Sequence, residues 1–182
     1  MANDTKELLL NHAIRLFNEN GSAALNIRAL ANASGVSVGT VYNNFLNKED
    51  IILSITELHW EKAIREFLKN ANTSTFIGFL SELYQFLMEN INDDIGNLMF
   101  KISPTDGNAR MKMMEMQSKF IPIIKDVLVN DGSINEDFYS KCIDINDFIV
   151  FILDNLILNL RNKNESIDFF LSLVKDILVI GY

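Results

Sequence analysis

Residues 26–50 constrain the fold of this chain more than any other stretch, because they predict two short helices joined by a tight turn. Ile27 and Leu30 are spaced to share the buried face of a first helix, and Asn26 is a residue type that caps helix N-termini. Gly35 follows, and glycine adopts positive φ without steric cost, which favours the end of a helix. The pattern predicts a helix-turn-helix within an all-α protein.

A second helix is predicted over residues 38–45, with Ser37 as its N-cap. Val38, Val41 and Phe45 fall at i, i+3 and i+7, so we expect these side chains to face the core. The other side chains are small or polar and are expected to face outward. A short helix with such an outer face is typical of the helix that enters the DNA major groove. The outward set is Gly39, Thr40, Asn43 and Asn44.

The same stretch resembles the DNA-binding signature of TetR-family transcriptional regulators. The core of the match is Val-Ser-x-Gly-Thr-x-Tyr-x-x-Phe-x-x-Lys-Glu, which is highly specific. The resemblance covers about a quarter of the chain, and no motif match extends beyond residue 69. The matching residues are Ile27, Ala31, Ala33, Gly35, Val36, Ser37, Gly39, Thr40, Tyr42, Phe45, Lys48, Glu49 and Ile52.

The resemblance implies that the second helix contacts a double-stranded DNA operator. Asn43 is able to pair with adenine and Thr40 to meet a thymine methyl group. The family often has His where this chain has Asn44, together with more basic residues, so the chain departs from the pattern there. The DNA-binding residues predicted in this way are Arg28, Ser37, Val38, Gly39, Thr40, Tyr42, Asn43, Asn44 and Lys48.

Residues 48–70 predict one long helix without a breaker, with Asn47 as its N-cap and acidic residues in its first turn. We expect a DNA-binding domain over residues 1–47 and a helical effector-binding and dimerisation domain over residues 48–182. The long helix would then connect the two. An effector that favours one tilt of this helix would change the spacing of the DNA-binding helices.

Further helices are predicted over residues 76–90, 95–102 and 108–130. Pro122 lies inside the last of these, so a kink or a new helix is expected near Ser118. These middle helices carry aromatic and methionine side chains, which suit a cavity for an apolar or amphipathic effector, although such residues are more often simply core. The candidate ligand-binding residues are His59, Trp60, Tyr84, Met99, Phe100, Met111, Met114 and Phe120.

The last two predicted helices, over residues 136–161 and 166–182, are apolar on nearly all sides. Each has a main apolar stripe, and a second apolar set that includes Phe151, Leu158 and Phe169 lies beside it. We expect a homodimer through a four-helix bundle, with a monomer containing a central hairpin as the alternative. The predicted interface residues are Ile145, Ile149, Ile152, Leu156, Leu160, Phe170, Leu173, Val174 and Ile177.

The charge of the chain complicates DNA binding. The net charge is −8 over 182 residues, and residues 1–50 carry four basic side chains against five acidic ones, a net charge of −1. Surfaces that bind duplex DNA usually carry a positive excess. An alternative function is therefore an all-helical dimeric ligand-binding or interaction protein with weak or lost DNA recognition.

Other functional classes find little support in the sequence. Cys142 is the single cysteine, which excludes an internal disulfide and suits the cytoplasm, and three aspartates interrupt the longest apolar stretch, so no membrane span is expected. His12, His59 and Cys142 are scattered without metal-binding spacing, and no catalytic or cofactor-binding motif occurs. The leading hypothesis is an effector-responsive repressor that binds a palindromic operator as a homodimer.

Overall fold

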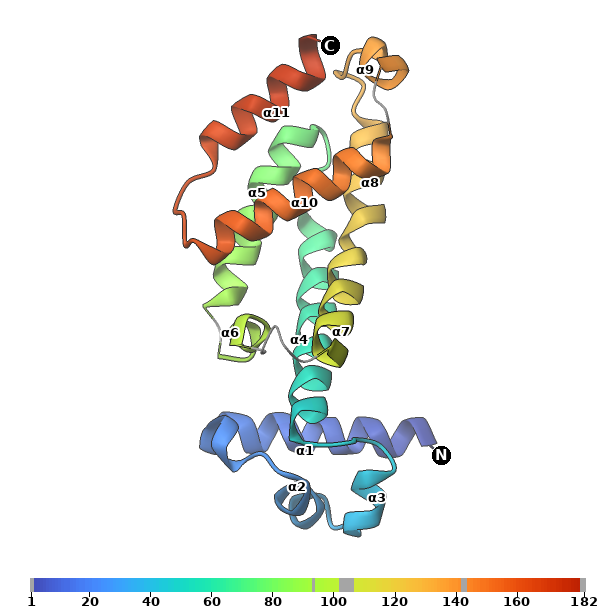
Figure 1. Ribbon diagram of the computed structural model, residues 1–182, viewed down its shortest axis with the longest axis vertical. Helices are drawn as coiled ribbons and strands as arrows, with labels where there is room; N and C mark the ends of the chain where they lie inside the picture. Colours follow the sequence, from blue (N-terminus) through green and yellow to red (C-terminus); the bar gives the residue numbers. More distant parts are fainter. Residues whose placement is uncertain (1, 93, 102–106, 142–143, 181–182) are drawn as a thin grey trace. The chain divides into compact units, whose positions relative to one another are not determined.

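The computed structural model describes residues 2–92, 94–101, 107–141 and 144–180, and all the regular elements in these ranges are α-helices (Figure 1). The predicted all-α class is confirmed. The chain divides into two compact units. Unit 1 comprises Met1–Lys62 and Asp94–Lys112, and unit 2 comprises Ala63–Asp93 and Met113–Tyr182. These units follow spatial contacts, and the domain boundary at residue 47 stays a prediction about function.

Unit 1 is built around the amino-terminal helices. Gly21, with φ 73° and ψ 178°, breaks the first helix where an Asn-Gly pair ends its apolar pattern, and a last turn follows it. The helices of this unit are α1 (Ala2–Ala24), α2 (Ile27–Ser34), α3 (Val38–Tyr42), the first part of α4 (Lys48–Asn70), α6 (Asp94–Lys101) and the first residues of α7 (Gly107–Ser118).

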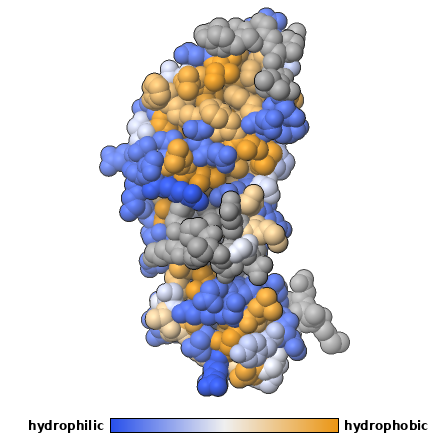
Figure 2. All heavy atoms as spheres, viewed as in Figure 1, coloured by the Kyte–Doolittle hydropathy of each residue, from blue (hydrophilic) through white to orange (hydrophobic). Residues whose placement is uncertain are grey.

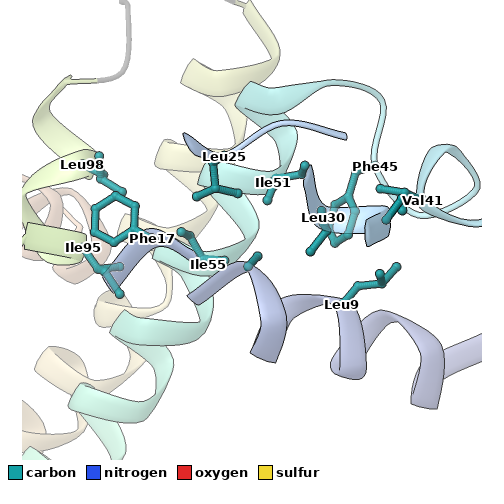
Figure 3. Close-up of a cluster of buried hydrophobic side chains, with 12 residues drawn as sticks. Leu9, Phe17, Leu25, Leu30, Val41, Phe45, Ile51, Ile55, Ile95 and Leu98 are labelled. Atoms are coloured by element: carbon teal, nitrogen blue, oxygen red, sulfur yellow. The ribbon is translucent and has the colours of Figure 1, made fainter. Parts of the chain in front are cut away.

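One apolar cluster joins α1, α2, α3, α4 and α6 (Figure 3). Leu9 of α1, Leu30 of α2 and Val41 of α3 converge on it and are fully buried. Each fully buried side chain of this size contributes about 1.5–3 kcal/mol to stability. The short α3 therefore depends on this cluster rather than on its own helix propensity. The complete cluster is Leu9, Ala13, Phe17, Leu25, Leu30, Ala31, Val41, Phe45, Ile51, Ile55, Ile95 and Leu98.

Unit 2 packs its helices crosswise. α10 lies across α8 and α5, and α11 packs against α5 and α9 (Figure 1). Phe67, near the end of α4, stacks on Phe86 of α5 with ring centroids 4.6 Å apart, so the last turns of α4 belong to this core. The helices are α5 (Phe76–Ile91), α8 (Phe120–Asn130), α9 (Glu136–Lys141), α10 (Ile145–Arg161) and α11 (Asp168–Ile180).

A buried carboxylate connects two of these helices. Asp131, directly after α8, accepts hydrogen bonds from the backbone N–H of Phe76 at 2.7 Å and from the Ser133 hydroxyl at 2.6 Å. Burial raises the pKa of Asp131, but these hydrogen bonds and the Ser133 backbone N–H outweigh it, so the pKa lies below its ordinary value. The ionised Asp131 thus caps the N-terminus of α5.

Two of the predicted helices have internal breaks. The break expected from Pro122 is confirmed, because α7 ends at Ser118 and α8 begins at Phe120. Pro122 is the third residue of α8, where a backbone N–H has no helical partner to lose. The prediction of a single helix over residues 136–161 is wrong, because α9 and α10 are separate helices. Asp144 has extended backbone and caps α10, accepting from the Asn146 N–H at 2.6 Å, and residues 142–143 lie outside the described ranges.

Among the helices of the described ranges, none combines the length and apolar character that a membrane span requires.

Candidate nucleic-acid interface

α2 is closed by hydrogen bonds at both of its ends, and the turn to α3 begins at the second of them. The Asn26 side chain accepts from the Ala29 N–H at 2.9 Å, which confirms the predicted N-cap of α2. Gly35 has φ 67°, and the Val36 N–H donates to the Ala31 carbonyl at 3.1 Å. This is the Schellman arrangement that ends a helix with a left-handed residue. The turn therefore has a single well-defined geometry.

α3 is shorter than predicted. Its N-cap is confirmed, because the Ser37 hydroxyl accepts from the Thr40 N–H at 3.1 Å. The helix ends at Tyr42 instead of residue 45, and the Asn44 side chain donates to the Thr40 carbonyl at 2.8 Å. Asparagine side chains compete for backbone groups in this way, which ends helices. The amide N–H₂ of Asn44 is thus partly engaged within the chain.

The inner and outer faces of α3 are clearly separated. Val41 and Phe45 are buried as predicted, whereas Val38, which we expected to face the core, is 40% exposed. Because α3 has only five residues, its inner face holds little more than Val41. Tyr42 is 57% exposed, and Asn43 is also exposed, so both side chains project outward. We call residues 37–47 the recognition segment.

The recognition segment is neutral and is flanked by cations. No charged residue occurs between Arg28 and Lys48. Arg28 is exposed, and the Lys6 ammonium lies 6.0 Å from the centroid of the Phe45 ring. Lys48 is the first residue of α4, where the helix dipole favours an anion, so its charge does not serve helix stability. These three cations therefore belong to α2, α1 and α4, and none lies within the segment itself.

The start of α4 is fixed to the recognition segment by reciprocal hydrogen bonds. The Asp50 N–H donates to the Asn47 side chain at 2.8 Å, which confirms Asn47 as the N-cap. The Asp50 carboxylate in turn accepts from the Leu46 N–H at 3.0 Å. This arrangement resembles a capping box and satisfies two backbone donors. It sets the direction in which the chain leaves the recognition segment.

The predicted ligand-binding residues are divided between the two units. His59, Trp60, Met99, Phe100 and Met111 belong to unit 1, and Tyr84, Met114 and Phe120 belong to unit 2. The side chains of Met99 and Phe100 lie outside the described part of the structure.

The described candidates differ in burial. Trp60, Tyr84 and Phe120 are buried, whereas Met111 and Met114 are 69% and 59% exposed. The Tyr84 hydroxyl donates to the Asn164 carbonyl at 2.5 Å, and burial raises the pKa of this phenol. Tyr84 therefore connects α5 to the loop before α11. This structural role was not predicted from the sequence.

Most of the predicted dimer residues are buried within the single chain. Ile149, Ile152, Leu156, Leu160, Phe170 and Val174 belong to the core of unit 2, and Ile145 and Ile177 are half-buried. The side chains that remain exposed come mainly from the second apolar set of these helices. We call them the α10–α11 surface, which comprises Val150, Phe151, Leu158, Phe169 and Leu173. Figure 2 shows apolar residues gathered on the visible face of unit 2, where α10 crosses α5 and α8 in Figure 1.

Among the side chains that the structure describes, no three His, Cys, Asp or Glu residues gather in a group that could hold a metal ion.

The geometry of α2, the turn and α3 defines a helix-turn-helix protein. Residues 9–55 match the model of the tetR family of bacterial regulatory proteins. The amino-terminal part of the chain is therefore similar to the DNA-binding part of this family.

Curated relatives match less than half of the chain. The transcriptional regulator UidR of Escherichia coli K12 is 30% identical over 81 residues, which is 44% of this chain and 41% of UidR. The chain thus aligns with less than half of the length of that relative.

Solved structures of similar fold cover nearly the whole chain. RolR in complex with resorcinol superposes with a TM-score of 0.65 at 17% identity, covering 99% of this chain and 90% of RolR. FadR from Bacillus subtilis, in complex with stearoyl-CoA, gives 0.51 at 19% identity and covers 97% and 98% of the two chains. At these identities the likeness shows the fold alone, and that fold has a helix-turn-helix followed by a helical carboxy-terminal part.

Proposed function

We propose that this protein is a DNA-binding transcriptional regulator, acting as an effector-responsive repressor. The observation that carries the proposal is the recognition segment, where buried Val41 and Phe45 hold Tyr42 and Asn43 in an outward position. A helix anchored in this way can enter the major groove while its neighbour crosses the backbone. The match to the tetR family supports the same function. Such a regulator acts in the cytoplasm, where bacterial DNA is found.

The recognition segment and its flanks supply two kinds of DNA contact in this proposal. Thr40, Asn43 and Val38 face base edges, whereas Arg28, Lys48 and the other polar candidates contact phosphates. Phosphate contacts fix the position of the protein on the duplex, and base contacts specify the sequence. The polar candidates for phosphate are Ser37, Tyr42 and Asn44, and Gly39 allows close approach of the backbone.

A homodimer would place two recognition segments on a palindromic operator, with half-sites about 34–36 Å apart or a multiple of this. We assign the dimer contact to the α10–α11 surface, because its side chains are apolar and exposed in the single chain. Exposed apolar patches of this kind mark protein–protein contacts. This assignment differs from the sequence prediction, which placed mainly the inner face of α10 at the interface. The proposed contact uses the outer face of α10 instead.

An apolar or amphipathic small molecule is the proposed effector. RolR and FadR share the fold and were solved with resorcinol and stearoyl-CoA, which belong to this chemical class. The continuous helix α4 supports coupling, because its residues up to Lys62 belong to unit 1 and those from Ala63 onward to unit 2. An effector that binds two conformers unequally shifts DNA affinity about 5–150-fold for a coupling of ~1–3 kcal/mol.

Fluorescence anisotropy with the DNA upstream of the gene tests the function. We expect a preference for one site over random duplex and a negative slope of log affinity against log salt concentration. Asn43→Ala should relax the preference at one base pair, whereas Lys48→Gln should weaken all duplexes equally. Equal affinity for every duplex would refute a sequence-specific regulator. Stearoyl-CoA and resorcinol serve as first effector probes, and a true effector must lower operator affinity.

A second function has one specific observation in its favour. The neutral recognition segment and the net charge of −1 over residues 1–50 fit an all-helical dimeric ligand-binding or interaction protein with weak DNA recognition. In that case the anisotropy experiment gives no site preference at any salt concentration, while sedimentation still detects a dimer. Site preference in the anisotropy experiment therefore distinguishes the two functions.

A further inference from the structure

The side chains of the recognition segment are chemically suited to one class of base pair. We propose that the segment selects half-sites whose core is A·T, and that Val38 packs against a thymine 5-methyl group. This inference rests on the proposed function, since it names the DNA sequence class that the same surface binds. The inference goes beyond the proposed function because a helix-turn-helix by itself favours no base composition.

The first argument is the absence of guanine-binding side chains. The commonest specific contact to guanine is an Arg or Lys side chain that donates to O6 and N7. Residues 29–47 contain no Arg, no Lys and no Gln. The cations Arg28 on α2, Lys48 at the start of α4 and Lys6 on α1 all lie outside residues 29–47, and we assign them to the phosphate contacts that position the protein.

The second argument concerns the hydrogen-bonding groups that remain available. The Ser37 and Thr40 hydroxyls lie 2.9 Å apart and bond to each other, and the Asn44 amide donates to the Thr40 carbonyl. The side-chain amide of Asn43 is exposed and makes no hydrogen bond within the described part of the chain. An asparagine amide matches the N7 acceptor and N6 donor of adenine. The best available base contact is therefore specific for A·T.

The third argument is the exposed apolar group. Val38 is 40% exposed at the start of α3, directly beside Gly39, which has no side chain. A Cβ at Gly39 would meet only the Ser37 hydroxyl oxygen, at 3.7 Å, so the protein has room for alanine there. Glycine at a site without steric need allows close approach of the backbone to a ligand. The thymine methyl is the apolar group that an unmodified major groove presents.

Selection from a random-sequence duplex library, with the full-length chain, tests the inference. We expect the enriched half-sites to have an A·T core. Each thymine of the selected duplex is then replaced by deoxyuridine, which removes only the 5-methyl group. One position should lose affinity about fourfold per half-site, which corresponds to burial of one methyl group.

Val38→Ala identifies the partner of that methyl group. The variant should bind the thymine duplex about fourfold more weakly and should no longer distinguish thymine from deoxyuridine, so the two changes are not additive. Val129→Ala is the matched control, because Val129 is also exposed but lies on α8 of unit 2. It should retain the full effect of deoxyuridine. Circular dichroism verifies that both variants are folded.

The outcomes separate the inference from the proposed function. A library without any enriched sequence refutes both. Enriched half-sites with a G·C core, or equal binding of thymine and deoxyuridine at every position, refute the inference and leave a sequence-specific regulator in place. A deoxyuridine effect that persists in Val38→Ala assigns the methyl contact to another side chain and refutes the role of Val38.

Discussion

The recognition segment and the α10–α11 surface both expose apolar side chains, but in different surroundings. Val38 and Tyr42 are exposed next to Thr40 and Asn43, so apolar and hydrogen-bonding groups alternate. The five side chains of the α10–α11 surface are all apolar, and Phe169 is 85% exposed. A surface of the first kind complements a polar groove that contains isolated methyl groups, whereas the second kind complements another apolar surface.

The two regions also differ in what supports them. α3 has five residues and is held by two buried anchors and by side-chain caps. α10 has 17 residues, and its inner face is buried from Ile149 to Leu160. A helix as short as α3 is not stable alone. The recognition segment is therefore sensitive to core changes, while the α10–α11 surface tolerates surface changes without unfolding. The following variants test this difference.

Phe45→Ala should have the largest effect on stability. Phe45 is fully buried in the core of unit 1, and removal of a buried phenylalanine costs about 3–5 kcal/mol. Urea denaturation should show this loss, and DNA binding should disappear with it. Val129→Ala is the control, because the Val129 side chain is 53% exposed on α8 and lies outside the α10–α11 surface. Equal losses for both variants would contradict the distinction between anchor and surface.

Phe169→Glu should weaken the homodimer. A charge placed in an apolar contact costs at least about 2 kcal/mol when the residue is central to the interface, which sedimentation velocity would detect as a monomer at micromolar concentration. Leu46→Glu is the control, since Leu46 is 74% exposed but belongs to the recognition segment. It should stay dimeric. If Phe169→Glu leaves the stability of the dimer unchanged, Phe169 does not belong to the interface.

Asp131→Asn should destabilise unit 2 in a pH-dependent manner. The pKa of Asp131 is lowered in the folded state, so its contribution is fully present above the unfolded pKa near 3.8 and is lost as pH falls through the lower folded pKa. We expect a loss of about 1.5 kcal/mol at pH 7 that decreases at low pH, measured by urea denaturation. Asp126→Asn, at an exposed position, should show little change. A pH-independent loss would exclude the ionised carboxylate as its cause.

Gly39→Ala should have the smallest effect on stability and the opposite sign. Alanine has room at this position and favours helix by about 0.5–1 kcal/mol, so the melting temperature should rise slightly. Operator affinity should nevertheless fall, because the added methyl group holds the backbone away from DNA. Gly78→Ala is the contrasting control, since a Cβ there would lie 2.7 Å from the Thr75 hydroxyl oxygen and should destabilise α5. Unchanged DNA affinity for Gly39→Ala would show that no close approach occurs.

Local signals in the sequence predicted much of the helix-turn-helix. Asn26, Ser37 and Asn47 cap their helices as expected, and Gly35 takes the positive φ that ends α2. Pro122 marks the beginning of α8 in the same way. These features depend on hydrogen bonds and torsion angles within a few residues, so neighbouring residues suffice to predict them.

The sequence by itself determined the class of the fold, the caps, the breaks at glycine and proline, and the family resemblance over the amino-terminal quarter. Only the tertiary structure decided that Val38 faces outward and that Ile149, Ile152 and Leu156 are core while Phe151 and Leu158 are surface. The periodicity of an apolar helix groups its residues into faces. When every face is apolar, the periodicity does not show which face is buried and which is exposed. Burial is then decided by which neighbouring helices are present, as α5 and α8 are beneath α10.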